Sequence, residues 1–206
     1  MKLYGDSQSG NCYKIQLLLS FLQGSDTRND IQNYEWKPVD ILAGETQAPA
    51  FLKINPNGKI PLLVLDDGRC LSESNAILNY LAEGSEYLPS DAFERAKVLQ
   101  WQFFEQYSHE PYIAVARFIA KYLGMPEARK AEFESKQQGG LKALSVMDEH
   151  LAKHDYLLGQ NFTIADISLY AYTHVADEGG FDLSRFPAVS AWLTRITSRE
   201  HYLAMT

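Results

Sequence analysis

The sequence predicts a chain of two parts, an α/β part with the element order βαβ–α–ββα followed by an all-helical part. Two observations predict this division. Strand-like and helix-like patterns alternate through the first 83 residues, and strand patterns cease after a short polar linker within Glu83–Pro89. We therefore expect a first domain over residues 1–82 and an all-helical domain over residues 89–206.

The composition is that of an ordinary globular protein, with 206 residues of which 46% are hydrophobic and 22% are charged. The formal net charge of −7 argues against a nucleic-acid partner, since binding phosphates requires a basic face. Two cysteines are too few for a disulfide scaffold, and neither a signal peptide nor a membrane-spanning apolar run is evident. We expect a cytoplasmic protein that does not bind membranes.

The α/β part opens with a short strand and a helix. Lys2–Tyr4 has a strand pattern, and after a polar turn the apolar spacing predicts a helix over Asn11–Gln23 that stops at Gly24. Residues 34–39 form the next predicted strand. Pro38 favours an edge position for that strand, because proline cannot donate a hydrogen bond to a neighbour.

The remaining strands and helices of the α/β part are predicted largely from the turn motifs that separate them. A short apolar segment over residues 50–54 precedes a dense turn signal, and residues 60–65 read as a buried strand. Asp66–Gly68 is typical of a hairpin turn that leads to a strand over residues 69–71. A helix over residues 74–81 closes the part.

The second part has helical spacing throughout, with Pro111 expected to kink or break its first helix. Thr163–Asp166 is similar to a capping box at a helix start, which we interpret as structural. The predicted helical segments are residues 93–123, 127–154, 163–176, 187–196 and 198–204.

The turn that contains Ser9, Asn11 and Cys12 lies between a predicted strand and a predicted helix. Helix N-termini favour negative charge, so a hydroxyl here could stabilise a bound anion such as a thiolate. The alternative is simple N-capping by Ser9 or Asn11. Cys12 could itself be a nucleophile with a depressed pKa, but without a CxxC motif we expect it to be a small packing residue.

Two further segments have both a binding and a structural interpretation. In Ile60–Pro61, a cis bond at the strand start would leave the backbone of Ile60 open to a ligand, whereas a trans bond would mark an edge strand. At the next helix start, Ser74 could hold a carboxylate and Glu73 an amino group, or both could be an ordinary cap. The five histidines are scattered and predict no metal site.

Together these segments resemble the cytosolic glutathione transferases, over essentially the whole chain. Four motifs occur in the order found in theta-, delta- and nu-like members of that family. They are Ser9–Cys12, Asn55–Pro61, Leu71–Ile77 and Phe162–Asp166. The resemblance implies a thioredoxin-like first domain, glutathione as co-substrate and a homodimer.

The resemblance also implies roles for individual residues. The Ile60–Pro61 bond would be cis, with the backbone of Ile60 pairing with the cysteinyl part of glutathione like an added strand. Glu73 and Ser74 would bind the γ-glutamyl end. Lys59 and Thr46 would face the glycyl carboxylate, although Thr46 stands where some classes have a histidine.

Two residues compete to activate the thiol. Ser9 has the spacing of the serine in theta- and delta-like members, three residues before a cysteine, whereas nu-like members rely on groups such as Asn11. Tyr4 offers another hydroxyl, which we expect to face the core. The chemistry implied is attack of the thiolate on an electrophilic carbon, or alternatively the reduction of a mixed disulfide.

The electrophile pocket would draw on the first long helix of the second part, with Phe104, Tyr107, Tyr112 and Arg117 as candidates. Aromatic side chains on helices also commonly pack in the core.

The sequence leaves three possible functions: a conjugating detoxification enzyme, a nu-like disulfide reductase, and a non-catalytic interaction module on the same fold.

Overall fold

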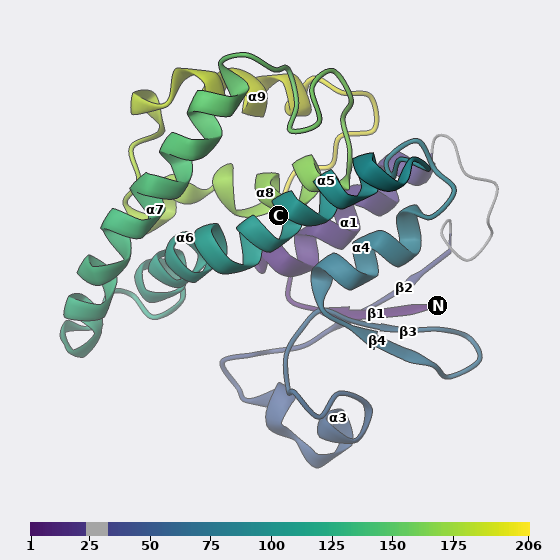
Figure 1. The fold of residues 1–206 in the computed structure, drawn as a ribbon. Helices are drawn as coiled ribbons and strands as arrows, with labels where there is room; N and C mark the ends of the chain where they lie inside the picture. The colour runs from purple at the N-terminus through teal and green to yellow at the C-terminus, as the bar shows by residue number, and fades with distance from the viewer. Residues whose placement is uncertain (24–32) are drawn as a thin grey trace. The chain divides into compact units, whose positions relative to one another are not determined.

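The computed structural model describes residues 1–23 and 33–206, which separate into two compact units. Unit 1 comprises Met1–Ser85 together with Glu200–Thr206, and unit 2 comprises Glu86–Arg199 (Figure 1). The predicted helix stop at Gly24 lies outside the described residues.

Unit 1 is built on a four-stranded mixed sheet with the order β2-β1-β3-β4 among the described residues. Strand β1 (Lys2–Gly5) pairs in parallel with β2 (Glu35–Pro38) and antiparallel with β3 (Leu62–Val64), which pairs with β4 (Cys70–Ser72). The order places β2 at an edge, which confirms the position predicted from Pro38.

Helices α1 (Gly10–Gln23) and α4 (Ser74–Ala82) pack together on one side of the strands, and α3 (Pro49–Ile54) lies on the other (Figure 1). A short 3₁₀ turn, η1 (Glu45–Gln47), precedes α3. The element order is the predicted βαβ–α–ββα of a thioredoxin-like domain. On the α3 side, Tyr4 packs edge-on against Phe51, which confirms that Tyr4 faces the core.

Unit 2 is all-helical, as predicted. In the described part of the chain no helix is long and apolar enough to cross a membrane. The longer elements are α5 (Ala92–Phe104), α6 (Glu110–Arg117), α7 (Lys130–Leu151), α8 (Ile164–Thr173) and α9 (Pro187–Thr197). The short ones are two π-helical turns, η2 (Glu105–His109) and η3 (Phe118–Tyr122), and the 3₁₀ turns η4 (Glu127–Arg129), η5 (Ala176–Gly179) and η6 (Leu183–Arg185).

Pro111 interrupts the regular α-helix of the first helical segment without ending it. The π-helical turn η2 comes directly before it, and Pro111 lies in the first turn of α6. A proline is tolerated there because its missing N–H is one that a helix start leaves unused.

Helix α7 contains two adjacent glycines, Gly139 and Gly140, and continues through both. Each glycine leaves room for an aromatic ring. A Cβ on Gly139 would lie 2.2 Å from the Tyr112 ring, and one on Gly140 would lie 2.3 Å from the Phe181 ring. These glycines allow close approach of the neighbouring elements.

The predicted capping box at Thr163 is confirmed and forms the start of α8. The Thr163 hydroxyl accepts a hydrogen bond from the Ala165 N–H, and the Thr163 N–H donates to the Asp166 carboxylate at 2.9 Å. Asp166 is fully buried, and burial raises its pKa to about 6 despite four hydrogen bonds.

The helix predicted over residues 198–204 is wrong. Two backbone carbonyls of this tail accept hydrogen bonds from α1, with the Tyr13 hydroxyl donating to Leu203 and the Ser20 hydroxyl donating to His201. His201 has φ 62°, in the left-handed region that interrupts a helix. These contacts with α1 override the local helical spacing.

Candidate active site

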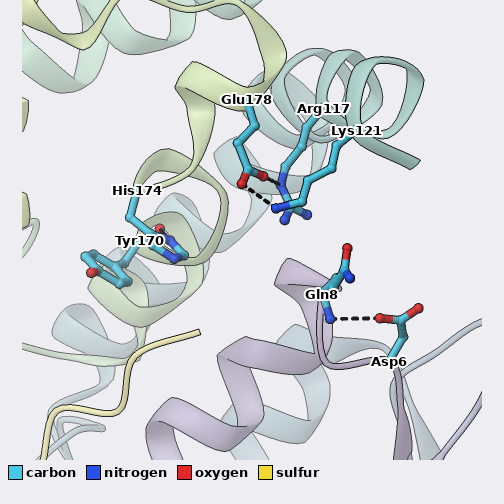
Figure 2. Close-up of polar contacts among 7 residues, drawn as sticks. All are labelled: Asp6, Gln8, Arg117, Lys121, Tyr170, His174 and Glu178. Atoms are coloured by element: carbon cyan, nitrogen blue, oxygen red, sulfur yellow. Dashed lines mark hydrogen bonds and ion pairs between the residues drawn. The ribbon is translucent and has the colours of Figure 1, made fainter. Parts of the chain in front are cut away.

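The turn after β1 is ordered by backbone and side-chain bonds within itself. The Gln8 N–H donates to the Asp6 carboxylate at 2.7 Å (Figure 2), and the Ser9 N–H donates to the Asp6 carbonyl at 3.1 Å. Helix α1 begins directly afterwards at Gly10. The turn therefore presents the N-terminus of a 14-residue helix, where the backbone dipoles favour negative charge.

Ser9 acts as a cap for this helix. Its hydroxyl oxygen accepts a hydrogen bond from the Cys12 N–H at 3.4 Å, which is the structural role considered from the sequence. A hydroxyl that accepts a bond still carries one O–H donor. The capping geometry is therefore compatible with donation from Ser9 to a bound thiolate.

Cys12 is a packing residue, as predicted. Its side chain is fully buried, and burial raises the pKa of its thiol to about 12, against the opposing effect of a hydrogen bond with Ser9. With no exposed surface, the Cys12 thiol is placed for packing and not for attack on a bound substrate.

Asn11 and Ser74 meet although 63 positions separate them in the sequence. The Ser74 hydroxyl donates to the Asn11 side-chain oxygen at 3.2 Å, which joins the first turn of α1 to the first turn of α4. The Lys14 ammonium donates to both, at 2.7 Å to Asn11 Oδ1 and 3.3 Å to Ser74 Oγ. Two predicted site residues are thus brought together by a lysine that the sequence analysis did not single out.

The Ile60–Pro61 bond is cis, which confirms the expectation from the family resemblance. The antiparallel ladder between β1 and β3 begins only at Leu62, so Ile60 takes no part in it. The Asn55 side-chain amide donates to the Lys59 carbonyl at 2.7 Å and holds the loop that leads to the proline. The segment just before β3 thus presents a partly exposed residue, Ile60, outside the ladder.

Glu73 lies at the start of α4 with φ 69° and ψ 113°, a backbone region that residues other than glycine rarely adopt. Its exposed carboxylate accepts a long hydrogen bond of 3.5 Å from the Asn57 side chain in the loop before Pro61. Strain of this kind is commonly found at ligand sites, where the surrounding structure maintains it. Glu73 and Asn57 bring the two predicted binding segments together.

The residues expected at the glycyl end lie near the same loop. Lys59 is exposed, and Thr46 is buried with its hydroxyl accepting a hydrogen bond from the Gln47 side chain at 3.3 Å. Gln47 also donates to the Gly58 carbonyl at 3.2 Å and so links η1 to the loop. The sequence analysis missed Gln47 because an exposed glutamine carries no pattern signal.

In unit 2, three of the four residues expected at an electrophile pocket line one cavity of about 170 Å³. Phe104, Tyr107 and Tyr112 contribute from the α5–α6 segment, and α7 forms the other wall. Arg117 does not line this cavity.

Arg117 is instead part of a charged cluster with Glu178 and Lys121 (Figure 2). Its Nε donates to Glu178 Oε2 at 2.5 Å, and Lys121 donates to the other carboxylate oxygen. Burial tends to raise the pKa of Glu178, but hydrogen bonds from the two cations outweigh it and hold that pKa below its usual value. Beside the cluster, His174 stacks on Tyr170, and burial lowers the pKa of this histidine.

Among residues 1–23 and 33–206, no group of three or more acidic, histidine or cysteine side chains is placed to hold a metal ion.

A thioredoxin-like sheet followed by an all-helical unit defines the class of two-domain thioredoxin-like proteins. Residues 1–83 match the family model described as the glutathione S-transferase N-terminal domain, and residues 101–200 match the one described as its C-terminal domain. The chain belongs to the glutathione S-transferase family.

Relatives and solved structures agree with this assignment. A glutathione S-transferase from Pseudomonas fluorescens Pf-5 is 59% identical with a TM-score of 0.93, covering 99% of this chain and 98% of that one. The disulfide-bond oxidoreductase YfcG of Escherichia coli (strain K12) is 33% identical over 174 residues, which are 81% of this chain and 80% of that protein. The glutathione transferase URE2P6 from Phanerochaete chrysosporium, solved in complex with oxidized glutathione, is 27% identical with a TM-score of 0.83, covering 97% and 91%.

Proposed function

We propose that this chain binds glutathione on unit 1 and stabilises its thiolate for attack on a small electrophilic substrate. The observation that carries the proposal is the 3.2 Å hydrogen bond between Ser74 and Asn11. This bond brings together the N-terminal turns of α1 and α4. Hydrogen-bond donors for the glutathione thiolate and donors for a glutathione carboxylate then lie within one site. A purely structural pair of helix caps would not need to be coupled in this way.

Glutathione would be held along its length by three segments. The backbone of Ile60, outside the ladder, pairs with the cysteinyl residue in the manner of an added strand. The backbone N–H groups at the N-terminus of α4, which begins at Ser74, receive the γ-glutamyl carboxylate, and Glu73 receives the γ-glutamyl amino group. Lys59 and Thr46 face the glycyl carboxylate.

The available groups are sufficient in magnitude for thiol activation. A thiol starts near a pKa of about 8.5, and lowering it by about two units requires about 2.7 kcal/mol of preferential interaction with the thiolate. One hydrogen bond to a charged group contributes about 1.5–3 kcal/mol, and the helix N-terminus adds to this. The Ser9 hydroxyl together with the start of α1 therefore accounts for the shift, with Asn11 as a second donor.

In the conjugation reaction, the thiolate sulfur forms a bond to an electrophilic carbon. The electrons of the bond that breaks leave with the displaced group, or remain on the substrate and take up a proton. A role in detoxification would follow from this chemistry.

A second candidate is a glutathione-dependent disulfide reductase, favoured by the way Asn11 is held. The Lys14 ammonium donates a hydrogen bond to the Asn11 side-chain oxygen, and the YfcG relative is named as a disulfide-bond oxidoreductase. In this reaction the glutathione thiolate attacks a mixed disulfide, forms glutathione disulfide and releases the second thiol. A non-catalytic interaction module is the third candidate, and it gives no reason for the coupled site on unit 1.

The test is a titration of enzyme-bound glutathione followed by its ultraviolet thiolate absorbance, for the wild type, Ser9→Ala and Asn11→Ala. We expect a thiol pKa about two units below the ordinary value in the wild type, and a rise of about one unit or more in Ser9→Ala. Ser7→Ala serves as the matched control, because Ser7 is exposed in the same turn.

Each outcome assigns a different function. A pKa that reverts in Ser9→Ala supports conjugation, whereas reversion in Asn11→Ala alone supports the disulfide reductase. If the wild type does not bind glutathione, both enzyme proposals are wrong and the interaction module replaces them.

The chain is also proposed to work as a homodimer in the cytoplasm. Along α5 and η2 the exposed apolar side chains of Leu99, Phe103 and Tyr107 recur every four residues on one face, with Val146 of α7 also exposed. Phe103 is 67% and Tyr107 86% exposed, which is unfavourable unless another chain covers them. Cys12 and Cys70 are free thiols, as suits a reducing compartment.

We predict that the wild type sediments at twice its 23.3-kDa chain mass and that Phe103→Glu shifts it toward the monomer. The reason is the cost of burying an unpaired carboxylate in an apolar contact. Analytical ultracentrifugation measures this, with Glu127→Gln on exposed η4 as the control. A monomeric wild type at micromolar concentration would contradict the dimer.

A further inference from the structure

Lys14 is a fully buried lysine in the second turn of α1. Its side chain has no exposed surface, and it lies between the buried residues Tyr13 and Ile15. Lysine is among the residues that are almost never fully buried unless they are paired. Its placement within an otherwise apolar helix therefore calls for a specific role.

The ammonium is directed at the candidate site. Nζ lies 2.7 Å from Asn11 Oδ1, one turn earlier on α1, and 3.3 Å from Ser74 Oγ on α4. Since Ser74 donates its own hydroxyl proton to Asn11 Oδ1, the three side chains form a closed triangle of hydrogen bonds. The triangle joins the two helix N-termini on which the proposed function depends.

The chemistry of an ammonium fixes which way the Asn11 amide faces. A lysine has three N–H donors and no acceptor, so only the oxygen of Asn11 can face it. The Ser74 hydroxyl donates to the same oxygen. The amide NH₂ group, bonded to the same carbon as that oxygen, is then directed away from Lys14 and Ser74.

We propose that Lys14 is a positioning residue of this site: its buried ammonium holds the oxygen of Asn11, so that Asn11 offers its NH₂ group as a hydrogen-bond donor to the glutathione thiolate. The inference rests on the proposed function and adds to it the residue that orients the donor. Without the ammonium, the Asn11 amide could turn over and present its oxygen, which would repel a thiolate.

The decisive variant is Lys14→Met, which keeps the length and apolar stem of the side chain but removes the charge and the donors. We expect the pKa of bound glutathione to rise by about one unit, a tenfold fall in the ratio of thiolate to thiol, as for the loss of one donor to a charged group. We expect the thermal midpoint to stay the same or to rise, because a buried charge is often replaced by an apolar group at no cost in stability. Lys53→Met is the matched control, because Lys53 is an exposed lysine on α3.

A double-variant comparison separates orientation of Asn11 from a direct effect of charge. If Lys14 acts through Asn11, then Lys14→Met in an Asn11→Ala background leaves the thiol pKa where Asn11→Ala alone puts it. The proposal would be overturned if Lys14→Met raised the thiol pKa by the same amount in the wild type and in the Asn11→Ala background. It would also be overturned if Lys14→Met alone left the thiol pKa unchanged.

Asn11→Asp tests the same idea if Lys14→Met does not fold, because an aspartate still accepts from Lys14 but has no donor. A rise in thiol pKa at least as large as in Asn11→Ala supports the proposal, and a wild-type value overturns it. A wild type that binds glutathione with an ordinary thiol pKa would instead show that the proposed function itself is wrong.

Discussion

Asp166→Asn should lower the free energy of unfolding by about 3 kcal/mol at pH 7.5, the upper end of the cost of leaving a buried backbone donor unmet. Asp166 is fully buried and accepts four hydrogen bonds. One oxygen accepts from the Leu157 N–H and the Trp192 indole N–H, both at 2.9 Å. The other accepts from the Thr163 N–H at 2.9 Å and the Thr163 hydroxyl at 3.4 Å.

An asparagine cannot satisfy this arrangement. Its NH₂ group must face one of the two pairs of donors, and the less costly choice is the Thr163 pair, where the hydroxyl can rotate. The Thr163 N–H is then left facing another donor in a site without exposed surface. The loss should appear as a lower midpoint in urea with an unchanged slope.

The same substitution at an exposed cap provides the control. Asp91 caps α5 by accepting from the N–H groups of Phe93 and Glu94, each at 3.0 Å. Asparagine caps helices about as well as aspartate does, so Asp91→Asn should change stability by less than about 0.5 kcal/mol. Equal losses at the two positions would show that burial of Asp166 is not the cause.

The sequence was most predictive where local signals and packing agree. The polar turn before α1, the hairpin between β3 and β4 and the capping box at Thr163 each depend on residues close together in the chain. Their boundaries agree with the structure to within about two residues, the usual uncertainty of helix and strand ends.

The predictions failed where distant contacts determine the structure. The tail after Ser198 has helical spacing, but its carbonyls accept hydrogen bonds from Tyr13 and Ser20, which are more than 180 positions away in sequence. No periodicity reports such a pairing.

At the candidate site, the sequence indicated the groups that we propose to contact glutathione but not the lysine behind them. Ser9, Asn11, Glu73 and Ser74 were found because they lie in polar turns at helix starts. Lys14 was missed because it lies within the apolar stretch of α1, although a single charge there is itself a signal. Its partner Ser74 is 60 positions away, so only the folded chain shows what that charge contacts.

Glu178→Gln should lower the free energy of unfolding by about 2 kcal/mol, less than the 3–5 kcal/mol typical of breaking a fully buried ion pair. The Arg117 side chain is 2% exposed and depends on Glu178, but the carboxylate is 29% exposed, so water partly screens the interaction. Glutamine keeps one acceptor oxygen and loses the charge that two cations share. Asp177→Asn, exposed on the same turn, is the control and should have little effect.

The dependence on pH distinguishes a lost charge from lost packing in this variant. The folded-state pKa of Glu178 is lowered from 4.5, so its ion pairs stabilise the wild type fully above that pH and are lost as the pH falls through the lower folded value. Glutamine does not titrate. Urea unfolding should therefore give a constant difference in free energy of unfolding between wild type and Glu178→Gln from about pH 5.5 to 8. This difference should become smaller below about pH 4.5. If this difference stayed the same at pH values well below 4.5, the loss of stability in Glu178→Gln would not come from the lost charge of Glu178.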